Sequence, residues 1–269
     1  MTAQAAAASN DIDTRPTRGA DLVVRALEAN GVTTVFGYPG GAIMPVYDAL
    51  AHSSLKHILC RHEQGAAFAA AGWSRMTGKA GVCLATSGPG ATNLVTGIAD
   101  AYMDSVPLVA ITGQVAQGVM GTDAFQEIDI FGITMPVVKH SYIVRDTDEL
   151  PHVIAEAFRI AQEGRPGPVL IDIPKDVQNA ETGTAPQIAA EPERIAADTD
   201  AIATAAQVIT EAQQPLFYVG GGVMRSRSTA SVRRLIEDSG IPTVATLQAQ
   251  GVLPTDHPQF LGMLGMHGS

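Results

Sequence analysis

The sequence predicts an α/β fold, with a doubly wound, mostly parallel sheet followed by a second, incomplete α/β domain. Three observations support this class. Strand-like and helix-period segments alternate from Gly19 onward. Glycine-rich turns follow several of the strand-like segments. Residues 168–173 form a continuous apolar run bounded by prolines, which is typical of a strand buried on both faces. We therefore expect this strand to lie centrally in its sheet.

The first domain follows from this alternation, element by element. Residues 21–30 have helical periodicity, and Gly31 ends that helix. The β-branched run 33–36 is a short strand that leads into a turn containing Tyr38 and Pro39. By the same criteria we predict helices over 43–51, 64–76, 91–103 and 150–162, and strands over 58–60, 81–85, 108–112 and 168–173. A long irregular stretch runs through Pro136.

Periodicity lapses after the first domain. Residues 181–198 are rich in Ala, Pro, Thr and Glu, a composition typical of a linker. Beyond them we predict a helix over 201–212, a strand over 216–219, a turn of three glycines, a helix over 228–239 and a strand over 242–247. We therefore expect a disordered tail over 1–18, a first domain over 19–180, a linker over 181–198 and a truncated central domain over 199–269.

Composition excludes several classes of protein. The chain has 17 Lys and Arg residues and 27 Asp and Glu residues, and the resulting net charge of -10 disfavours binding to nucleic acid. Hydrophobic residues make up 46% of the chain, but no apolar run approaches the ~18 residues that span a membrane. The two cysteines, Cys60 and Cys83, are far from a CxxC spacing. We expect a cytoplasmic protein without a membrane segment or a disulfide framework.

Glu63 is the sharpest candidate for catalysis. The segment Arg61–Gln64 places this carboxylate between a short strand and an alanine-rich helix. The alternative is an ordinary glutamate that satisfies backbone N–H groups at a helix start. A zinc motif HExxH is excluded because Ala66 stands where the second histidine is required, and we predict no metal ligands in this chain.

Other candidates lie in turns and at strand ends. The turns Ser87–Asn93 and Gly220–Gly222 could bind phosphate at a helix N-terminus, but neither fits a standard fingerprint. Taken alone, each segment is better interpreted as a tight turn. The segment Asp123–Glu127 lies in the long irregular stretch, where ordered loops are often functional. Asp172 and Lys175 lie at the end of the strand over 168–173, where such sheets bind ligands, or else form a surface ion pair.

Taken together, these segments resemble one family. The motifs Phe36–Gly41, Arg61–Gln64, Thr86–Asn93 and Asp123–Glu127 occur in the order found in the catalytic large subunits of acetolactate synthases. The motifs Gly164–Pro168, Ile173–Asp176, Tyr218–Gly222 and Leu261–Gly268 continue the match. Each motif is weak alone, but together they identify the chain as similar to the N-terminal part of this thiamine-diphosphate-dependent family.

The resemblance implies a role for each matching residue. The glutamate that matches Glu63 hydrogen-bonds N1′ of the cofactor's aminopyrimidine. It thereby promotes loss of the C2 proton from the cofactor's thiazolium ring. The residues implied around the pyrimidine are Tyr38, Pro39, Thr86, Pro89, Asn93 and Gln126, and those at the substrate entrance are Phe125 and Lys175. The residues implied to contact FAD are Arg165, Gly220, Gly221, Gly222, Thr246, Leu247, Met263, Gly265, Met266, His267 and Gly268.

The resemblance also implies partners. The substrates would be pyruvate and 2-oxobutyrate, used in branched-chain amino-acid biosynthesis. Magnesium and the cofactor's diphosphate would be bound by a third domain outside these 269 residues, and each site would form between two subunits of a homodimer or a higher oligomer. A small regulatory subunit is a further possible partner. We therefore expect the chain to be inactive by itself.

Two alternatives remain open at this stage. One is another thiamine-diphosphate-dependent decarboxylase or oxidase, which would share the glutamate and the sheet. The other is a short product without catalysis that serves as a binding or subunit-interaction module. Within the enzymes, the segments Asp123–Glu127 and Leu261–Gly268 favour acetolactate synthase.

Overall fold

The computed structural model describes residues 17–192 and 196–268. Two compact units divide the chain, with the boundary between residues 193 and 194. The first unit is a mostly parallel sheet with helices on both faces, which confirms the predicted α/β class. Of the tail predicted over residues 1–18, residues 1–16 lie outside the described residues, and Thr17 and Arg18 form a short strand.

The sheet of the first unit has six strands in the order β3-β2-β4-β5-β7-β6, and every neighbouring pair is parallel. The strands are β2 (Thr34–Gly37), β3 (Lys56–Leu59), β4 (Gly81–Ala85), β5 (Leu108–Gln114), β6 (His140–Ile143) and β7 (Pro168–Pro174). All seven residues of β7 are buried, as the apolar run predicts. However, β7 is next to the edge strand β6 and is not at the middle of the sheet.

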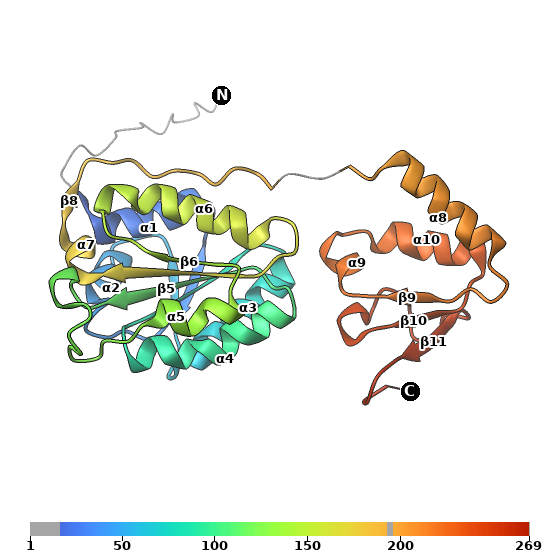
Figure 1. Ribbon diagram of the computed structural model, residues 1–269, viewed down its shortest axis with the longest axis horizontal. Coiled ribbons are helices and arrows are strands. Elements are labelled where there is room, and N and C mark those ends of the chain that lie inside the picture. Colours follow the sequence, from blue (N-terminus) through green and yellow to red (C-terminus); the bar gives the residue numbers. More distant parts are fainter. Residues whose placement is uncertain (1–16, 193–195, 269) are drawn as a thin grey trace, which may run out of the picture. The chain divides into compact units, whose positions relative to one another are not determined.

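Helices cover both faces of this sheet. They are α1 (Gly19–Ala29), α2 (Met44–Leu50), α3 (Glu63–Thr77), α4 (Pro89–Met103), α5 (Ile130–Thr134), α6 (Leu150–Gln162) and α7 (Lys175–Asn179), with 3₁₀ turns η1 (Gln117–Val119), η2 (Met135–Val137) and η3 (Thr147–Glu149). Figure 1 shows α1 and α6 on one side of the strands and α3, α4 and α5 on the other.

Two hydrophobic clusters account for this arrangement. Successive strand residues point to opposite faces, so Leu84 and Ile111 pack with α1, α2 and α6, whereas Cys83 and Ala110 pack with α3, α4 and α5. The second cluster is rich in alanine on α3, which allows that helix to pack closely on the sheet and on α4.

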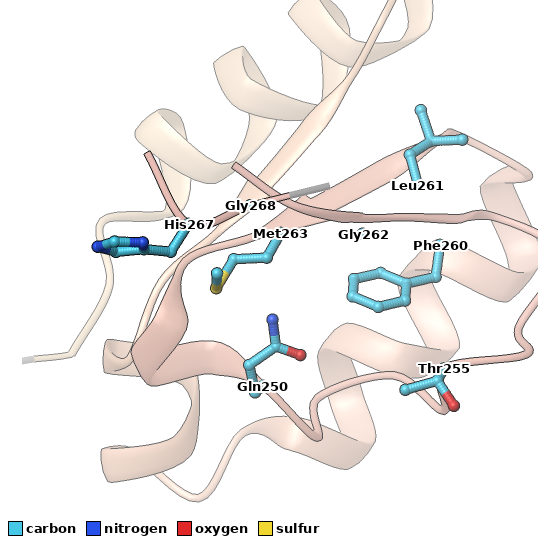
Figure 2. Close-up of a pocket in the computed structure, with 8 residues that line it drawn as sticks. All are labelled: Gln250, Thr255, Phe260, Leu261, Gly262, Met263, His267 and Gly268. Carbon is cyan, nitrogen blue, oxygen red and sulfur yellow. The ribbon is translucent and has the colours of Figure 1, made fainter. Parts of the chain in front are cut away.

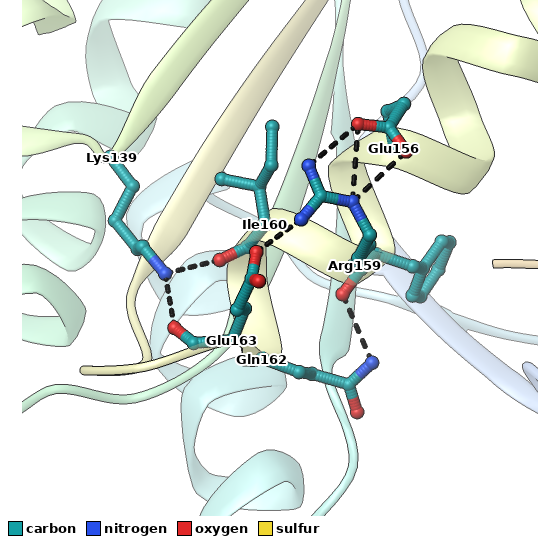
Figure 3. Close-up of polar contacts among 7 residues, drawn as sticks. Lys139, Glu156, Arg159, Ile160, Gln162 and Glu163 are labelled. Carbon is teal, nitrogen blue, oxygen red and sulfur yellow. Dashed lines mark hydrogen bonds and ion pairs between the residues drawn. The ribbon is translucent and has the colours of Figure 1, made fainter. Parts of the chain in front are cut away.

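The C-terminal end of α6 is tied to the segment that precedes β6. Lys139 donates hydrogen bonds to the carbonyl oxygens of Ile160 and Glu163, the latter at 2.6 Å. Arg159 pairs with Glu156 on the same helix and with Glu163, the residue that follows it (Figure 3). A lysine that binds the last carbonyls of a helix supplies partners that these groups otherwise lack.

Several short elements were not predicted. Helix α5 and strand β6 lie in or just after the stretch expected to be irregular, where their few residues give no clear period. Strand β1 (Thr17–Arg18) pairs antiparallel with β8 (Glu181–Thr182). The predicted tail and linker are therefore wrong for these four residues, because backbone pairing orders them.

The second unit contains a small parallel sheet in the order β11-β10-β9. Its elements are α8 (Thr199–Glu211), β9 (Phe217–Val219), α9 (Gly222–Arg225), α10 (Thr229–Ser239), β10 (Thr243–Ala245), η4 (Leu247–Ala249) and β11 (Phe260–Met263). Strand β10 is shorter than the predicted 242–247, and β11 was not predicted as a strand. Among the described helices of both units, none is long and apolar enough to cross a membrane.

Candidate functional site

Glu63 is the first residue of α3 and lies at the carboxyl edge of the six-stranded sheet. The chain leaves β3 at Leu59, and His62 caps the helix by accepting a hydrogen bond from the Gln64 amide through Nδ1 at 3.1 Å. This cap begins the helix at Glu63, whose side chain is 8% exposed. Open α/β sheets bind ligands at this edge.

The Glu63 carboxylate is held by a residue of the neighbouring helix. Asn93 Nδ2 donates a hydrogen bond to Glu63 Oε2 at 2.9 Å. Gly90 lies beside the pair, because a Cβ at Gly90 would lie 3.3 Å from Glu63 Oε1 and 2.7 Å from Thr86 Cγ2. Only a glycine fits there without displacing one of these side chains.

The turn after β2 forms a second part of the site. Thr86 Oγ1 accepts a hydrogen bond from the Ala42 amide at 3.0 Å. A Cβ at Gly40 would lie 2.5 Å from Thr86 Cγ2, so the turn backbone packs directly on Thr86. Tyr38 and Pro39 belong to this turn, and the Tyr38 ring is exposed. The structure therefore brings the turn that carries both residues next to the turn that leads into α4.

The loop between β5 and α5 forms a third part. A Cβ at Gly88 would lie 2.6 Å from the carbonyl oxygen of Gln126, so the two backbones are in close contact. Gln126 itself has a φ of 59°. The Glu127 carboxylate accepts hydrogen bonds from the amides of Gly121 and Ala124, which lower the pKa of Glu127. These bonds organise the loop from within.

The two residues predicted at the substrate entrance are both exposed. Phe125 is 87% exposed at the tip of the loop. Lys175 is exposed at the first position of α7, directly after β7. Both residues follow the carboxyl ends of strands, so they lie at the same edge of the sheet as Glu63.

Asp172 does not form the surface ion pair considered above. It is 1% exposed, and its carboxylate accepts hydrogen bonds from Thr112 Oγ1 at 2.6 Å and Gln114 Nε2 at 3.0 Å. Burial raises the pKa of Asp172 to about 7, although the two hydrogen bonds act in the opposite direction. The residue lies inside the sheet because β7 is buried along its whole length.

In the second unit, most of the predicted flavin residues lie at the carboxyl edge of the small sheet. Gly220, Gly221 and Gly222 follow β9, Thr246 and Leu247 follow β10, and Gly265, Met266, His267 and Gly268 follow β11, which ends at Met263. The Thr246 amide donates to the Val219 carbonyl at 2.9 Å, and the Leu264 amide donates to the Ala245 carbonyl at 3.2 Å. These two bonds hold the three segments together.

An open groove of about 520 Å³ lies along β11. Its lining residues, shown in Figure 2, are Gln250, Thr255, Phe260, Leu261, Gly262, Met263, His267 and Gly268. Three predicted flavin residues therefore line the groove, while the glycine turn, Thr246 and Leu247 do not. Gly221 packs against η4 instead, since its Cβ would lie 2.7 Å from Gln248 Cβ.

Arg165, also predicted to contact the flavin, belongs to the first unit. Its guanidinium donates to Ser105 Oγ at 2.7 Å and to the Met103 carbonyl at 3.2 Å, and it lies 6.0 Å from the Tyr102 ring centre. These contacts hold it against the C-terminal end of α4. Within the described parts of both units, no group of three or more His, Cys, Asp or Glu residues is arranged to hold a metal ion.

Two buried residues near the site were missed by the sequence analysis. Gln114 and Gln178 are 3% and 0% exposed, respectively. Both bond to the backbone of loops that carry candidate site residues. For Gln114 a signal was present, because a polar residue closes an otherwise apolar strand, whereas Gln178 in a short helix has no comparable signal.

Two models of one enzyme family match the chain. The model described as "Thiamine pyrophosphate enzyme, N-terminal TPP binding domain" matches residues 17–133, and "Thiamine pyrophosphate enzyme, central domain" matches residues 202–269. The acetolactate synthase isozyme 2 large subunit of Escherichia coli K12 is 53% identical over 251 residues, which cover 93% of this chain and 46% of that protein.

Two further relatives give the same result. The isozyme 1 large subunit of Escherichia coli K12 is 55% identical over 253 residues, covering 93% of this chain and 45% of that protein. The acetolactate synthase large subunit of Corynebacterium glutamicum is 54% identical over 256 residues, covering 93% and 41%. The chain thus spans a little under half the length of the curated relatives it matches.

Proposed function

The chain belongs to the thiamine pyrophosphate enzyme family, and on that basis we propose that it forms the pyrimidine-binding and central parts of an acetolactate synthase catalytic subunit. In the proposed reaction pyruvate loses carbon dioxide, and the remaining two-carbon unit joins a second 2-oxo acid, pyruvate or 2-oxobutyrate. The products are precursors of branched-chain amino acids. The names of the relatives favour this reaction over that of another decarboxylase or oxidase.

The observation that carries the proposal is the buried Glu63 carboxylate, held by Asn93 beside Gly90. Thiamine diphosphate, when bound, would supply a carbon acid whose conjugate base, formed by loss of its proton, can add to the keto group of the substrate. Glu63 would share a proton with the pyrimidine nitrogen N1′, and Asn93 would fix the direction of the carboxylate. Burial keeps water from competing for that proton, which is what a general acid–base role requires.

The backbone segments around Glu63 pack closely on one another. Gly40, Gly88 and Gly90 each lack a Cβ where one would collide with a neighbouring residue of the site. Thr86, Pro89, Gln126, Tyr38 and Pro39 lie on the segments that these glycines bring together. We assign those five residues to the walls of the pyrimidine site, and Phe125 and Lys175 to the substrate entrance.

The remaining parts of the proposal concern partners. FAD would bind the carboxyl edge of the second unit, and magnesium and the diphosphate would be held by residues outside this chain. We further propose a homodimer or higher oligomer, with a small regulatory subunit, because relatives are named large subunits. We also propose a cytoplasmic location, because the chain has only two cysteines and they do not have a CxxC spacing.

Substitution of Glu63 by Gln tests the central assignment. In the holoenzyme that carries this chain, Glu63→Gln is expected to slow deuterium exchange at C2 of bound thiamine diphosphate by on the order of 10²-fold or more, while magnesium-dependent binding of the diphosphate persists. Exchange is followed by proton NMR, and acetolactate formation from pyruvate is assayed in parallel. Glu149→Gln, at an exposed position directly before α6, is the matched control. Unchanged exchange in Glu63→Gln refutes the assignment.

A further inference from the structure

Two buried glutamines lie at the carboxyl edge of the large sheet, each bonded to a different loop. Gln114 is the last residue of β5, and Gln178 lies in α7, which follows β7. They are 3% and 0% exposed. A buried amide is costly where its polar atoms lack partners. The Gln114 amide bonds through both its nitrogen and its oxygen, whereas the Gln178 amide bonds through its nitrogen alone, since Gln178 Oε1 has no hydrogen-bond partner among the described residues.

Gln114 joins the two ends of the loop that carries Phe125 and Gln126. Its Nε2 donates to the carbonyl oxygen of Ile128 at 3.0 Å and to Asp172 Oδ2 at 3.0 Å. Its Oε1 accepts from the Val115 amide at 2.9 Å. The side chain therefore bonds both Val115, the first residue after β5, and Ile128, two residues before α5 begins, and it anchors both to Asp172 on β7.

Gln178 holds the turn after β2 through its amide nitrogen. Its Nε2 donates to the Ala42 carbonyl at 2.8 Å and to the Ile173 carbonyl at 2.7 Å. The Ala42 amide meanwhile donates to Thr86 Oγ1. Ala42 is thus fixed through both of its backbone polar groups, and the close approach of Gly113 to its carbonyl leaves the turn little room to shift.

We propose that Gln114 and Gln178 are positioning residues, each of which holds one wall of the pyrimidine site: Gln114 the loop with Phe125 and Gln126, and Gln178 the turn with Tyr38 and Pro39. The two clamps act on separate segments, so their loss has separable consequences. The identity of the ligand between these two segments rests on the proposed function, whereas the positioning of the segments by Gln114 and Gln178 does not depend on it.

Methionine at each position provides a matched pair of variants, because it is similar in length and apolar but lacks the amide. Hydrogen exchange followed by mass spectrometry is measured on the chain. Gln114→Met is expected to speed exchange over residues 118–129 by on the order of tenfold and to leave residues 38–44 unchanged, and Gln178→Met is expected to do the reverse. Equal changes in both segments, or no change in either, overturn the proposal.

If a methionine variant does not fold, Gln114→Asn and Gln178→Asn replace it. Asparagine keeps a polar group in the buried space but is too short to bridge the same two partners. The segment-specific pattern expected is the same, and its absence in the folded asparagine variants overturns the proposal in the same way.

The link to the proposed function has its own readout. In the holoenzyme, each variant is expected to raise the KM for thiamine diphosphate by on the order of tenfold and to leave kcat at saturating cofactor within about twofold, since Glu63 is unaltered. A fall in kcat with KM unchanged overturns the positioning role. If the exchange pattern holds but Glu63→Gln leaves C2 exchange intact, the clamps stand and the proposed function fails.

Discussion

Asn93 and Glu63 lie 30 positions apart in the chain, yet the Asn93 amide donates a hydrogen bond to Glu63 Oε2 at 2.9 Å. The bond joins the first residue of α3 to the fifth residue of α4, and these two helices pack against each other on one face of the sheet. It fixes the direction of the buried Glu63 carboxylate, on which the proposed chemistry depends.

Replacement of Asn93 by Leu should expose the importance of this bond for stability. The buried carboxylate would lose its donor, and we expect the free energy of unfolding to fall by about 1–3 kcal/mol. Chemical denaturation measures the change. Thr96→Val, at an exposed position of the same helix, should change it by less than about 0.5 kcal/mol. Equal losses in the two variants would contradict a role for the Glu63 bond.

Gly90 and Gly72 offer a paired test of backbone packing. A Cβ at Gly90 meets Thr86 Cγ2 at 2.7 Å, whereas a Cβ at Gly72 in α3 meets nothing within 4 Å. Gly90→Ala should therefore destabilise the protein by about 1–3 kcal/mol. Gly72→Ala should stabilise it by about 0.5–1 kcal/mol, because alanine favours a helix interior. Thermal unfolding should give shifts of opposite sign, and shifts of the same sign would be inconsistent with this packing.

Asp172 should make stability depend on pH. Its folded pKa of about 7 is raised above the ordinary value of 3.8. The stabilisation that protonated Asp172 contributes is fully present below a pH of about 4 and is lost as the pH rises through about 7. The Asp172→Asn variant cannot ionise at this position. Its free energy of unfolding, relative to that of the wild type, should therefore be higher at pH 8 than at pH 5. Urea denaturation at both values measures this.

Asp148 is the control for that experiment. Hydrogen bonds from Thr182 and Thr184 lower its pKa below 3.8, so its contribution is constant between pH 5 and pH 8. Asp148→Asn should shift stability equally at both values. A pH-independent difference for Asp172→Asn would show that its carboxyl group is not the source of the effect.

Lys139 should stabilise the end of α6. Lys139→Met removes the donors to the Ile160 and Glu163 carbonyls, and we expect a loss of about 1–2 kcal/mol. Faster hydrogen exchange should be confined to the last turn of α6. Lys56→Met, on the exposed face of β3, should leave both measurements unchanged. If α6 exchanges at the wild-type rate in Lys139→Met, the lysine does not cap the helix.

Much of the fold could be predicted from local pattern. The strand over 81–85 and the helix over 150–162 have the predicted bounds, since long apolar or amphipathic runs are readable from periodicity alone. The helix expected over 64–76 begins one residue earlier, at Glu63, because the His62 cap sets its start. Short elements such as α5, β6 and β11 could not be predicted, because their few residues carry too little period.

The sequence by itself determined the α/β class, the order of the major elements and the candidate glutamate, because each depends on residues close together in the chain. Only the tertiary structure decided which distant groups meet: Asn93 with Glu63, Thr86 with Ala42, and Asp172 with Gln114 inside the sheet. A hydrogen bond between groups brought together by strand order leaves no periodic signal in sequence. Parallel pairing places these segments at one edge, and burial then selects the partners.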